Sequence, residues 1–183
     1  MRKSNANARR EGLEGEVDFC RFAITHGKTI GSTHRDVIAE LGLAPGIREL
    51  EPSSPYDVYL KGAIPALFEV KRRDGPTDWE EPPHDDGPCD CLEEHRLDKL
   101  LALTNRALVY CAVQYGPGSP WAVVDIPKLD GLRREGIARC YRTGPRAKSF
   151  YNGKLETMPT WYWPVRFFRP LESIWPQQQS PET

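Results

Sequence analysis

Two short runs of alternating side chains, Tyr56–Leu60 and Leu67–Arg72, restrict the fold of this chain more than any other feature. Between them lies Lys61–Pro65, which contains the glycine and proline that turns favour. The two runs are therefore predicted to be β-strands joined as a hairpin. Because side chains alternate along a strand, one face of this hairpin is expected to be apolar and the other to carry charges.

The charged face of the hairpin holds three residues of catalytic type. Glu69 and Lys71 are two positions apart and therefore share a face, opposite to Val70. In the first run Val58 belongs to the apolar face and Asp57 to the other. If the hairpin pairs in its natural register, Asp57 lies beside Glu69 and Lys71.

The beginning of the chain is predicted to form a helix from about Asn7 to Thr25. Its expected inward stripe consists of Leu13, Val17, Cys20, Ala23 and Ile24. Glu16 falls on this apolar side and not with the outward acidic residues. A carboxylate directed at the core is unfavourable unless it is paired or bound to a metal. Glu16 is therefore a candidate fourth member of the charged group.

The remaining elements predict a sheet covered by helices. In chain order they are a helix at His34–Leu41 capped by Ser32 or Thr33, a helix at Cys91–Asn105, a buried strand at Ala107–Val113, a neighbouring strand at Trp121–Ile126, a further helix, and an aromatic strand at Trp161–Phe168. Pro164 restricts the last strand to a sheet edge. This order predicts a single α/β domain spanning residues 1–183, with a mixed central sheet flanked by helices and a C-terminal extension at 155–183.

The charge distribution is uneven, although the net charge of the 183 residues is only −1. The Pro- and Gly-rich segment 74–92 is predicted to be an acidic loop, and Asp74–Glu94 contains nine acidic residues and no lysine or arginine. The rest of the chain has 25 basic residues against 17 of the 26 acidic ones, a net charge of +8. The loop could mimic DNA and block the site, hold a second metal, or serve only as a solvated linker. Asp74 and Asp78 are its members nearest to Lys71.

The basic residues fall into three groups of a kind that suits a phosphate backbone. These groups are Arg2, Lys3, Arg9 and Arg10; Lys71, Arg72 and Arg73; and Arg133, Arg134, Arg139, Arg142, Arg146, Lys148 and Lys154. The candidate nucleic-acid contacts are Arg9, Arg10, Arg72, Arg73, Arg96 and Lys99. Each group is equally compatible with an ordinary solvated surface.

Converging carboxylates beside a lysine indicate a metal site for phosphodiester chemistry. Carboxylates repel one another, and a hard divalent cation relieves that repulsion. Mg²⁺ keeps several waters, binds substrate phosphate and lowers the pKa of a bound water. A nearby lysine ammonium can orient or help deprotonate the attacking water, and can offset phosphate charge. The expected catalytic residues are therefore Glu16, Asp57, Glu69 and Lys71.

Asp57 followed by the Glu69–Lys71 tripeptide, with Glu16 on an upstream helix, resembles the PD-(D/E)XK nuclease superfamily. The likeness covers about residues 12–126. It is closest to the branch that contains archaeal-type Holliday-junction resolvases and phage or restriction-type nucleases. The resemblance implies a restriction-endonuclease-like fold and a function in DNA recombination or restriction.

The resemblance also implies roles for individual residues. Asp57 and Glu69 would be metal ligands, together with the backbone carbonyl of Val70. Lys71 would assist the attacking water, and Glu16 would support the site or bind a second metal. The implied cofactor is Mg²⁺ or Mn²⁺, and the implied partner is DNA. Related enzymes pair to cut two strands, so a homodimer is expected, with the aromatic tail as a candidate interface.

Three weaker patterns remain open. One is a zinc site of histidine and cysteine ligands, made of His84, Cys89, Cys91 and His95, although a Cys-x-Cys spacing is tighter than the usual structural pattern. Another is a stacking surface for unpaired bases, or equally a sheet edge that closes the core, made of Trp161, Trp163, Phe167 and Phe168. The third is an odd count of five cysteines, which indicates free thiols.

The sequence therefore predicts a metal-dependent deoxyribonuclease, an endonuclease acting on duplex or branched DNA. One alternative is a catalytically silent nucleic-acid-binding module on the same fold. Another is an interaction protein that works through the acidic loop. No membrane partner is expected, because the longest apolar stretch, Ala107–Val113, is far too short to cross a bilayer. The chain begins with no secretory signal, so the expected location is the cytoplasm.

Overall fold

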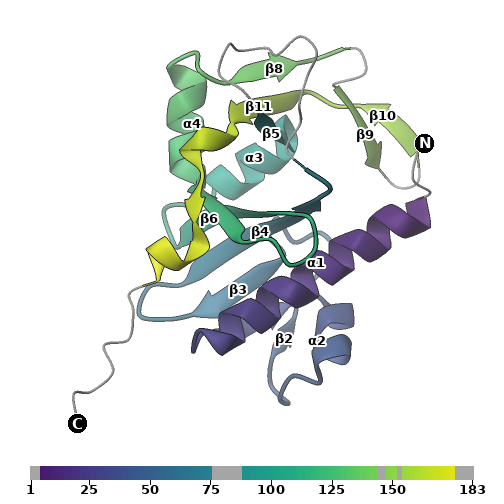
Figure 1. Cartoon of the computed structure of the whole chain (residues 1–183), viewed down its shortest axis with the longest axis vertical. Coiled ribbons are helices and arrows are strands. Elements are labelled where there is room, and N and C mark those ends of the chain that lie inside the picture. Colours follow the sequence, from purple (N-terminus) through teal and green to yellow (C-terminus); the bar gives the residue numbers. More distant parts are fainter. Residues whose placement is uncertain (1–4, 76–87, 144–146, 152–153, 176–183) are drawn as a thin grey trace.

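A seven-stranded sheet with the strand order β12-β7-β6-β4-β3-β1-β2 organises the chain (Figure 1). The computed structural model describes residues 5–75, 88–143, 147–151 and 154–175. The sheet consists of β1 (Thr29–Thr33), β2 (Arg48–Glu49), β3 (Val58–Lys61), β4 (Ala66–Arg73), β6 (Leu108–Tyr115), β7 (Trp121–Asp125) and β12 (Arg169–Pro170). The helices are α1 (Asn5–Thr25), α2 (Arg35–Leu41), α3 (Glu94–Leu101) and α4 (Ile126–Arg134).

The predicted hairpin is the pair β3–β4, which is antiparallel with Val58 opposite Phe68. On its other side β4 pairs in parallel with β6, and β6 pairs antiparallel with β7. Parallel and antiparallel neighbours therefore occur in one sheet. The predicted fold class, a mixed central sheet flanked by helices, is confirmed.

Two apolar cores cover the two faces of this sheet. On one face α1 packs against the hairpin, with Phe19 and Cys20 close to Phe68 and Val70 in a single buried cluster. The other face is covered by α3 and α4, whose leucines form a second buried cluster with β6 (Figure 1). Alternation along β4 therefore directs Phe68 and Val70 toward α1 and Glu69 between them toward α3.

Helix α1 starts two residues earlier than predicted and is rotated relative to the predicted stripe. Phe19, which was not assigned to the stripe, is 0% exposed, whereas Ile24 is 44% exposed. Phe19, Cys20 and Ala23 are fully buried, and Glu16 lies one helical turn before Phe19 and Cys20 on the same side. The helix lies very close to β4 at Gly15, where an added Cβ atom would be only 2.9 Å from the Cβ of Arg72.

The prediction for Ser32 and Thr33 as helix caps is wrong. Both residues lie in β1, paired with Tyr59 and Val58 of β3. The residue before α2 is His34, which has an extended backbone. β1 was missed because its sequence, TIGST, has only one large apolar residue to reveal the alternation.

The predicted boundary between acidic loop and third helix is also wrong. Cys89–Glu93 forms the strand β5, and α3 begins at Glu94 and ends at Leu101. The helix predicted from Cys91 and the loop predicted to extend to residue 92 both overlap this strand. Residues 76–87 of the acidic loop lie outside the described residues.

The aromatic strand is β11 (Thr160–Pro164), and it is central and not at an edge. It lies between β5 and β8 (Arg139–Tyr141) in a separate three-stranded sheet. Pro164 is tolerated because it is the last residue of the strand, opposite Cys89. The chain then continues through short 3-10 turns at Val165–Phe167 and Leu171–Ile174, on either side of β12. A further hairpin pairs β9 (Lys148–Tyr151) with β10 (Lys154–Thr157).

No helix in the described part of the chain combines the length and the apolar character needed to cross a membrane.

Candidate active site

Asp57 and Glu69 lie side by side on the hairpin, away from its turn. The Asp57 N–H donates to the Phe68 carbonyl at 2.9 Å, so the ladder continues one residue beyond the start of β3. The two acids are almost withdrawn from water, because Asp57 is 6% exposed and Glu69 is 0% exposed. The register inferred from the sequence is therefore confirmed.

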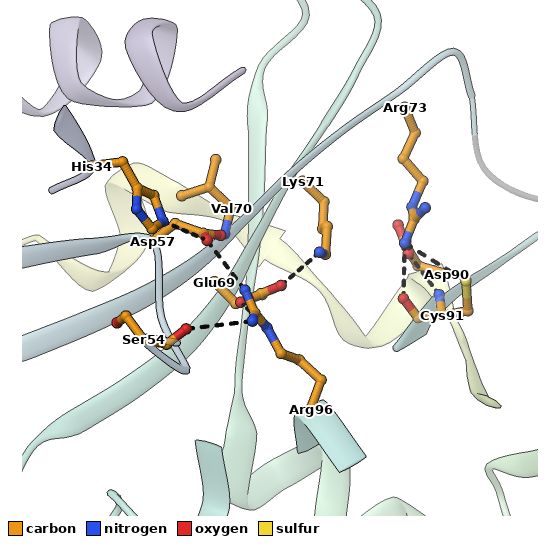
Figure 2. Close-up of polar contacts among 10 residues, drawn as sticks. All are labelled: His34, Ser54, Asp57, Glu69, Val70, Lys71, Arg73, Asp90, Cys91 and Arg96. Carbon is orange, nitrogen blue, oxygen red and sulfur yellow. Dashed lines mark hydrogen bonds and ion pairs between the residues drawn. The ribbon is translucent and has the colours of Figure 1, made fainter. Parts of the chain in front are cut away.

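The Asp57 carboxylate is held from three directions (Figure 2). Its Oδ2 accepts a 2.7 Å hydrogen bond from the Val70 N–H. Its Oδ1 lies 3.5 Å from His34 Nε2 and 3.2 Å from Arg96 Nη2. A backbone donor fixes one oxygen, and the His34 imidazole and the Arg96 guanidinium face the other.

The Glu69 carboxylate lies between two cations (Figure 2). Lys71 Nζ is 2.6 Å from Oε1, and Arg96 Nε donates to Oε2 at 2.8 Å. Arg96 reaches in from α3 and bridges Glu69 to Asp57, while its Nη1 donates to the Ser54 carbonyl at 3.4 Å. Arg96 is thus a member of the site itself.

Burial and neighbouring charges separate the pKa values of these groups. Burial and the charge of Asp57 raise the pKa of Glu69, although Lys71 and Arg96 offset part of the rise. Burial would also raise the pKa of Asp57, but the hydrogen bond with His34 and the charges of Lys71 and Arg96 lower it overall. Burial works to lower the pKa of Lys71, but Glu69 and Asp57 raise it well above its usual value. The Lys71 ammonium therefore stays protonated at neutral pH.

Glu16 reaches the same group from α1. Its Oε2 is buried and has no hydrogen-bond partner among the described residues. Burial, with a further contribution from the Asp57 charge, raises the pKa of Glu16 to about 8. Ligand atoms of Glu16, His34 and Asp57 all lie within 4.8 Å of one another. An orphaned buried carboxylate oxygen in such a group is what a bound cation would satisfy.

His34 is a site residue that the sequence did not reveal. It follows β1 directly and precedes α2, so its position depends on a strand whose pattern is too weak to predict. Pairing of β1 with β3 brings it next to Asp57, 23 positions away in the chain. The only local signal was a lone histidine beside a predicted helix start.

Arg72 and Arg73 were predicted to contact nucleic acid, but in the structure both pair with acids of the chain itself. Arg72 turns back to α1, where its Nη2 donates to Asp18 at 2.6 Å, and its side chain is only 9% exposed. Arg73 donates from Nε to Asp90 at 2.9 Å and from Nη2 to the Cys91 carbonyl at 2.8 Å (Figure 2). Both guanidinium groups hold neighbouring elements to the end of β4.

The other candidate contacts differ in their surroundings. Arg9, Arg10 and Lys99 are exposed. Arg10 Nε is 2.8 Å from Glu14, one turn along its own helix. A role of these three residues in nucleic-acid contact stays a prediction. From the predicted basic groups, the positions that lie outside the described residues are Arg2, Lys3 and Arg146.

The aromatic strand and the cysteines contribute to the packing of the fold. Trp163 is 1% exposed within the core, and the Trp161 indole N–H donates to Glu94 at 3.1 Å, so this strand closes the structure.

Of the candidate zinc ligands, Cys91 contacts Arg73 and His84 lies outside the described residues. Asp78 of the acidic loop also lies outside them. All five cysteines are free thiols, as predicted.

The matches found by comparison with solved structures include two of similar extent. A Holliday junction resolvase from the archaeal hyperthermophile Archaeoglobus fulgidus matches over 89% of this chain and 93% of its own, with 11% identity and a TM-score of 0.49. A nuclease from a fusselovirus matches over 93% of this chain and 89% of its own, with 7% identity and a TM-score of 0.48. No family model and no curated protein matches the chain.

The site combines two features that suit reaction at a phosphate. The carboxylates of Glu16, Asp57 and Glu69 converge where solvent is largely excluded, so that a cation bound there would interact strongly. Lys71 supplies fixed positive charge at Glu69, and Arg96 supplies it to both Glu69 and Asp57. Such charge can stabilise negative oxygens that develop during phosphoryl chemistry.

Proposed function

We propose that this chain is a metal-dependent nuclease of the PD-(D/E)XK superfamily that hydrolyses DNA phosphodiester bonds. The observation that carries the proposal is the convergence of Asp57, Glu69 and Lys71 on one hairpin, with the orphaned carboxylate of Glu16 beside them. A chance pair of surface charges would be solvated, whereas these acids are buried and held from several sides. The proposed cofactor is Mg²⁺ or Mn²⁺.

Each residue has a distinct role in this proposal. Asp57 and Glu69 would hold the cation, with the Val70 carbonyl as a further ligand and Glu16 as a support or ligand of a second ion. When bound, the cation would supply an acidified water and neutralise charge on the scissile phosphate. Lys71, which remains protonated, would orient the attacking water and offset phosphate charge instead of accepting a proton. Arg96, released from a carboxylate, would hold a phosphate oxygen.

DNA would approach beside the hairpin. A pocket of about 400 Å³ opens there, and Ser54, Tyr56 and Tyr59 contribute to its lining. Ser54 also contacts Arg96, so the pocket adjoins the site. The exposed Arg9, Arg10 and Lys99 would contact the backbone, which positions a protein without specifying sequence.

We favour endonucleolytic cleavage of duplex or branched DNA by a homodimer, in which each copy would cut one strand. The second candidate function is a catalytically silent nucleic-acid-binding module. The basic residues alone would be enough for that function, but such a module would not explain why Asp57 and Glu69 are buried. Such a module would lose affinity steeply with salt and cleave nothing under any metal.

The test is cleavage of labelled linear, branched and single-stranded substrates with Mg²⁺, Mn²⁺ or chelator. Wild type is compared with Asp57→Ala, Lys71→Met and Glu135→Gln, the last being an exposed acid outside the site. Metal-dependent products from wild type and Glu135→Gln, absent with the other two variants, are expected. Binding without cleavage in every condition, or cleavage that survives Asp57→Ala, would contradict the proposal.

A further inference from the structure

His34 adds an imidazole to a group that otherwise contains carboxylates. It precedes α2 with φ −67° and ψ 150°, and its side chain is 30% exposed. The neighbouring Thr33 hydroxyl donates to the Asp57 carbonyl at 3.3 Å. This contact and the β1–β3 pairing join the histidine to the aspartate through the backbone as well as through their side chains.

We propose that Glu16, His34 and Asp57 form a mixed nitrogen and oxygen site that selects Mn²⁺ over Mg²⁺. The proposal rests on the proposed nuclease function and assigns the ligands and the metal preference of the ion for which Glu16 is a candidate ligand, with Asp57 shared between this ion and the one beside Glu69. Ligand atoms of the three residues lie within 4.8 Å of one another, close enough to surround one ion. The residues come from α1, the β1–α2 junction and the start of β3, so folding alone brings them together.

The distribution of positive charge favours this side of Asp57. Both oxygens of Glu69 already face a cation, Lys71 on one and Arg96 on the other. Glu69 Oε1 and Glu16 Oε2 are both buried without a hydrogen-bond partner among the described residues, but Lys71 Nζ lies 2.6 Å from the first, whereas Glu16 forms no ion pair with any described residue. A bound cation is therefore expected between Glu16 and Asp57, where His34 is the third possible ligand.

The donor set determines which ion fits. Mg²⁺ prefers oxygen ligands in a near-octahedral arrangement and gives up its waters reluctantly. Imidazole is a good ligand for first-row transition ions, and Mn²⁺ also accepts carboxylates. Two carboxylates and one imidazole are therefore expected to bind Mn²⁺ more tightly than Mg²⁺, while a site of oxygens alone would discriminate less.

The experiment measures metal binding to the full chain without nucleic acid. Isothermal titration calorimetry gives the affinities for Mn²⁺ and Mg²⁺. Electron spin echo spectroscopy of bound Mn²⁺ reports whether an imidazole nitrogen coordinates the ion directly. The variants are His34→Ala, His34→Asp, Asp57→Asn and the control His26→Ala, an exposed histidine directly after α1. Circular dichroism checks that each variant is folded, and His34→Asp retains a ligand should His34→Ala fail to fold.

Wild type and His26→Ala are expected to show the nitrogen signal and to prefer Mn²⁺. His34→Ala should lose the signal and at least about tenfold in Mn²⁺ affinity, with a smaller change for Mg²⁺. His34→Asp should bind both ions without the nitrogen signal and with reduced preference. Unchanged Mn²⁺ affinity and selectivity in His34→Ala, with binding abolished by Asp57→Asn, would overturn the role of His34 and leave the nuclease proposal standing. A wild type that binds neither ion would remove the metal-dependent nuclease itself.

Discussion

The amide N–H of Val70 donates to Asp57 Oδ2 at 2.7 Å. The backbone of β4 therefore fixes the carboxylate of the residue that directly precedes β3. The other oxygen of Asp57 is thereby directed at His34 and Arg96. The orientation of this acid follows from strand pairing and does not depend on the flexible end of a side chain. A change of register by one residue would move the carboxylate to the opposite face.

Because the orientation of Asp57 is fixed in this way, Asp57→Asn tests the effect of its charge separately from the effect of its shape. Asparagine keeps the size of the side chain and an oxygen that can accept the Val70 hydrogen bond, but it removes the negative charge. We expect cleavage to fall by roughly 10²-fold or more, a loss comparable to removal of one stabilising group in other active sites. The fold should persist in circular dichroism, and Glu135→Gln should cleave like wild type. Cleavage within a few-fold of wild type would exclude Asp57 as a metal ligand.

Arg96 and a bound cation compete for the same carboxylates. In Arg96→Gln the bridge between Asp57 and Glu69 is lost, so the two acids repel each other more strongly in the metal-free protein. We expect a lower free energy of unfolding, by about 1–3 kcal/mol. Mn²⁺ affinity should rise, and the ion should then restore more stability than it gives wild type. Thermal melts with and without Mn²⁺ check both effects, and Arg134→Gln, at an exposed arginine of α4, is the control. Unchanged or weaker Mn²⁺ binding would show that Arg96 does not oppose the metal.

Glu16 predicts how metal-free stability depends on pH. Its folded-state pKa is about 8 and its ordinary value is 4.5, so the folded state holds the proton more tightly. The stabilisation is complete below about pH 4.5 and is lost as the pH rises toward and through 8. The loss should be on the order of 1–3 kcal/mol. Urea denaturation in chelator from pH 5 to about pH 9 measures it.

The Glu16→Gln variant isolates this contribution, because His34 and Glu69 also have raised pKa values and contribute in the same direction. Its stability should fall less over the same pH range than that of wild type. Saturating Mn²⁺ should reduce the fall in wild type, since a bound cation favours the ionised carboxylate. Parallel pH profiles for wild type and Glu16→Gln would contradict the assignment of the shift to this residue.

Arg72 distinguishes a structural arginine from one that binds nucleic acid. Arg72→Gln removes the 2.6 Å contact with Asp18 and leaves that acid without its partner on β4. We expect the free energy of unfolding to fall by about 1–3 kcal/mol, while the salt dependence of DNA affinity stays unchanged. Lys99→Gln should leave the free energy of unfolding almost unchanged. It should reduce the slope of log DNA affinity against log salt concentration by about 1. Equal salt slopes for Lys99→Gln and wild type would remove Lys99 from the interface.

The parts of the fold that could be predicted are those with a local pattern. The β3–β4 hairpin has a largely alternating pattern and a turn sequence, and β6 contains most of the continuous apolar run Ala107–Val113. Glu16 was recognised because a helical period places it among apolar residues. In each case the signal lies within a few residues of the feature that it predicts.

What could not be predicted depends on partners distant in the chain. Arg72 looked available for a phosphate because its partner Asp18 lies 54 positions earlier. The strand β5 was hidden in an acidic segment, because the arginine that compensates Asp90 is Arg73 at the end of β4. His34 needed β1 to be known before its distance to Asp57 had meaning. Charge pairing through space leaves no periodic trace in the sequence.

The close approach of α1 to β4 at Gly15 gives this glycine an influence on the chemistry next to it. A single methyl group there would meet Arg72 at 2.9 Å and push the helix outward. Glu16, the next residue, would retreat with it from His34 and Asp57. How closely the Glu16 carboxylate approaches His34 and Asp57 therefore depends on the absence of a side chain at position 15. Variation at position 15 would alter the affinity for metal in a protein whose acids, histidine and lysine were all still present.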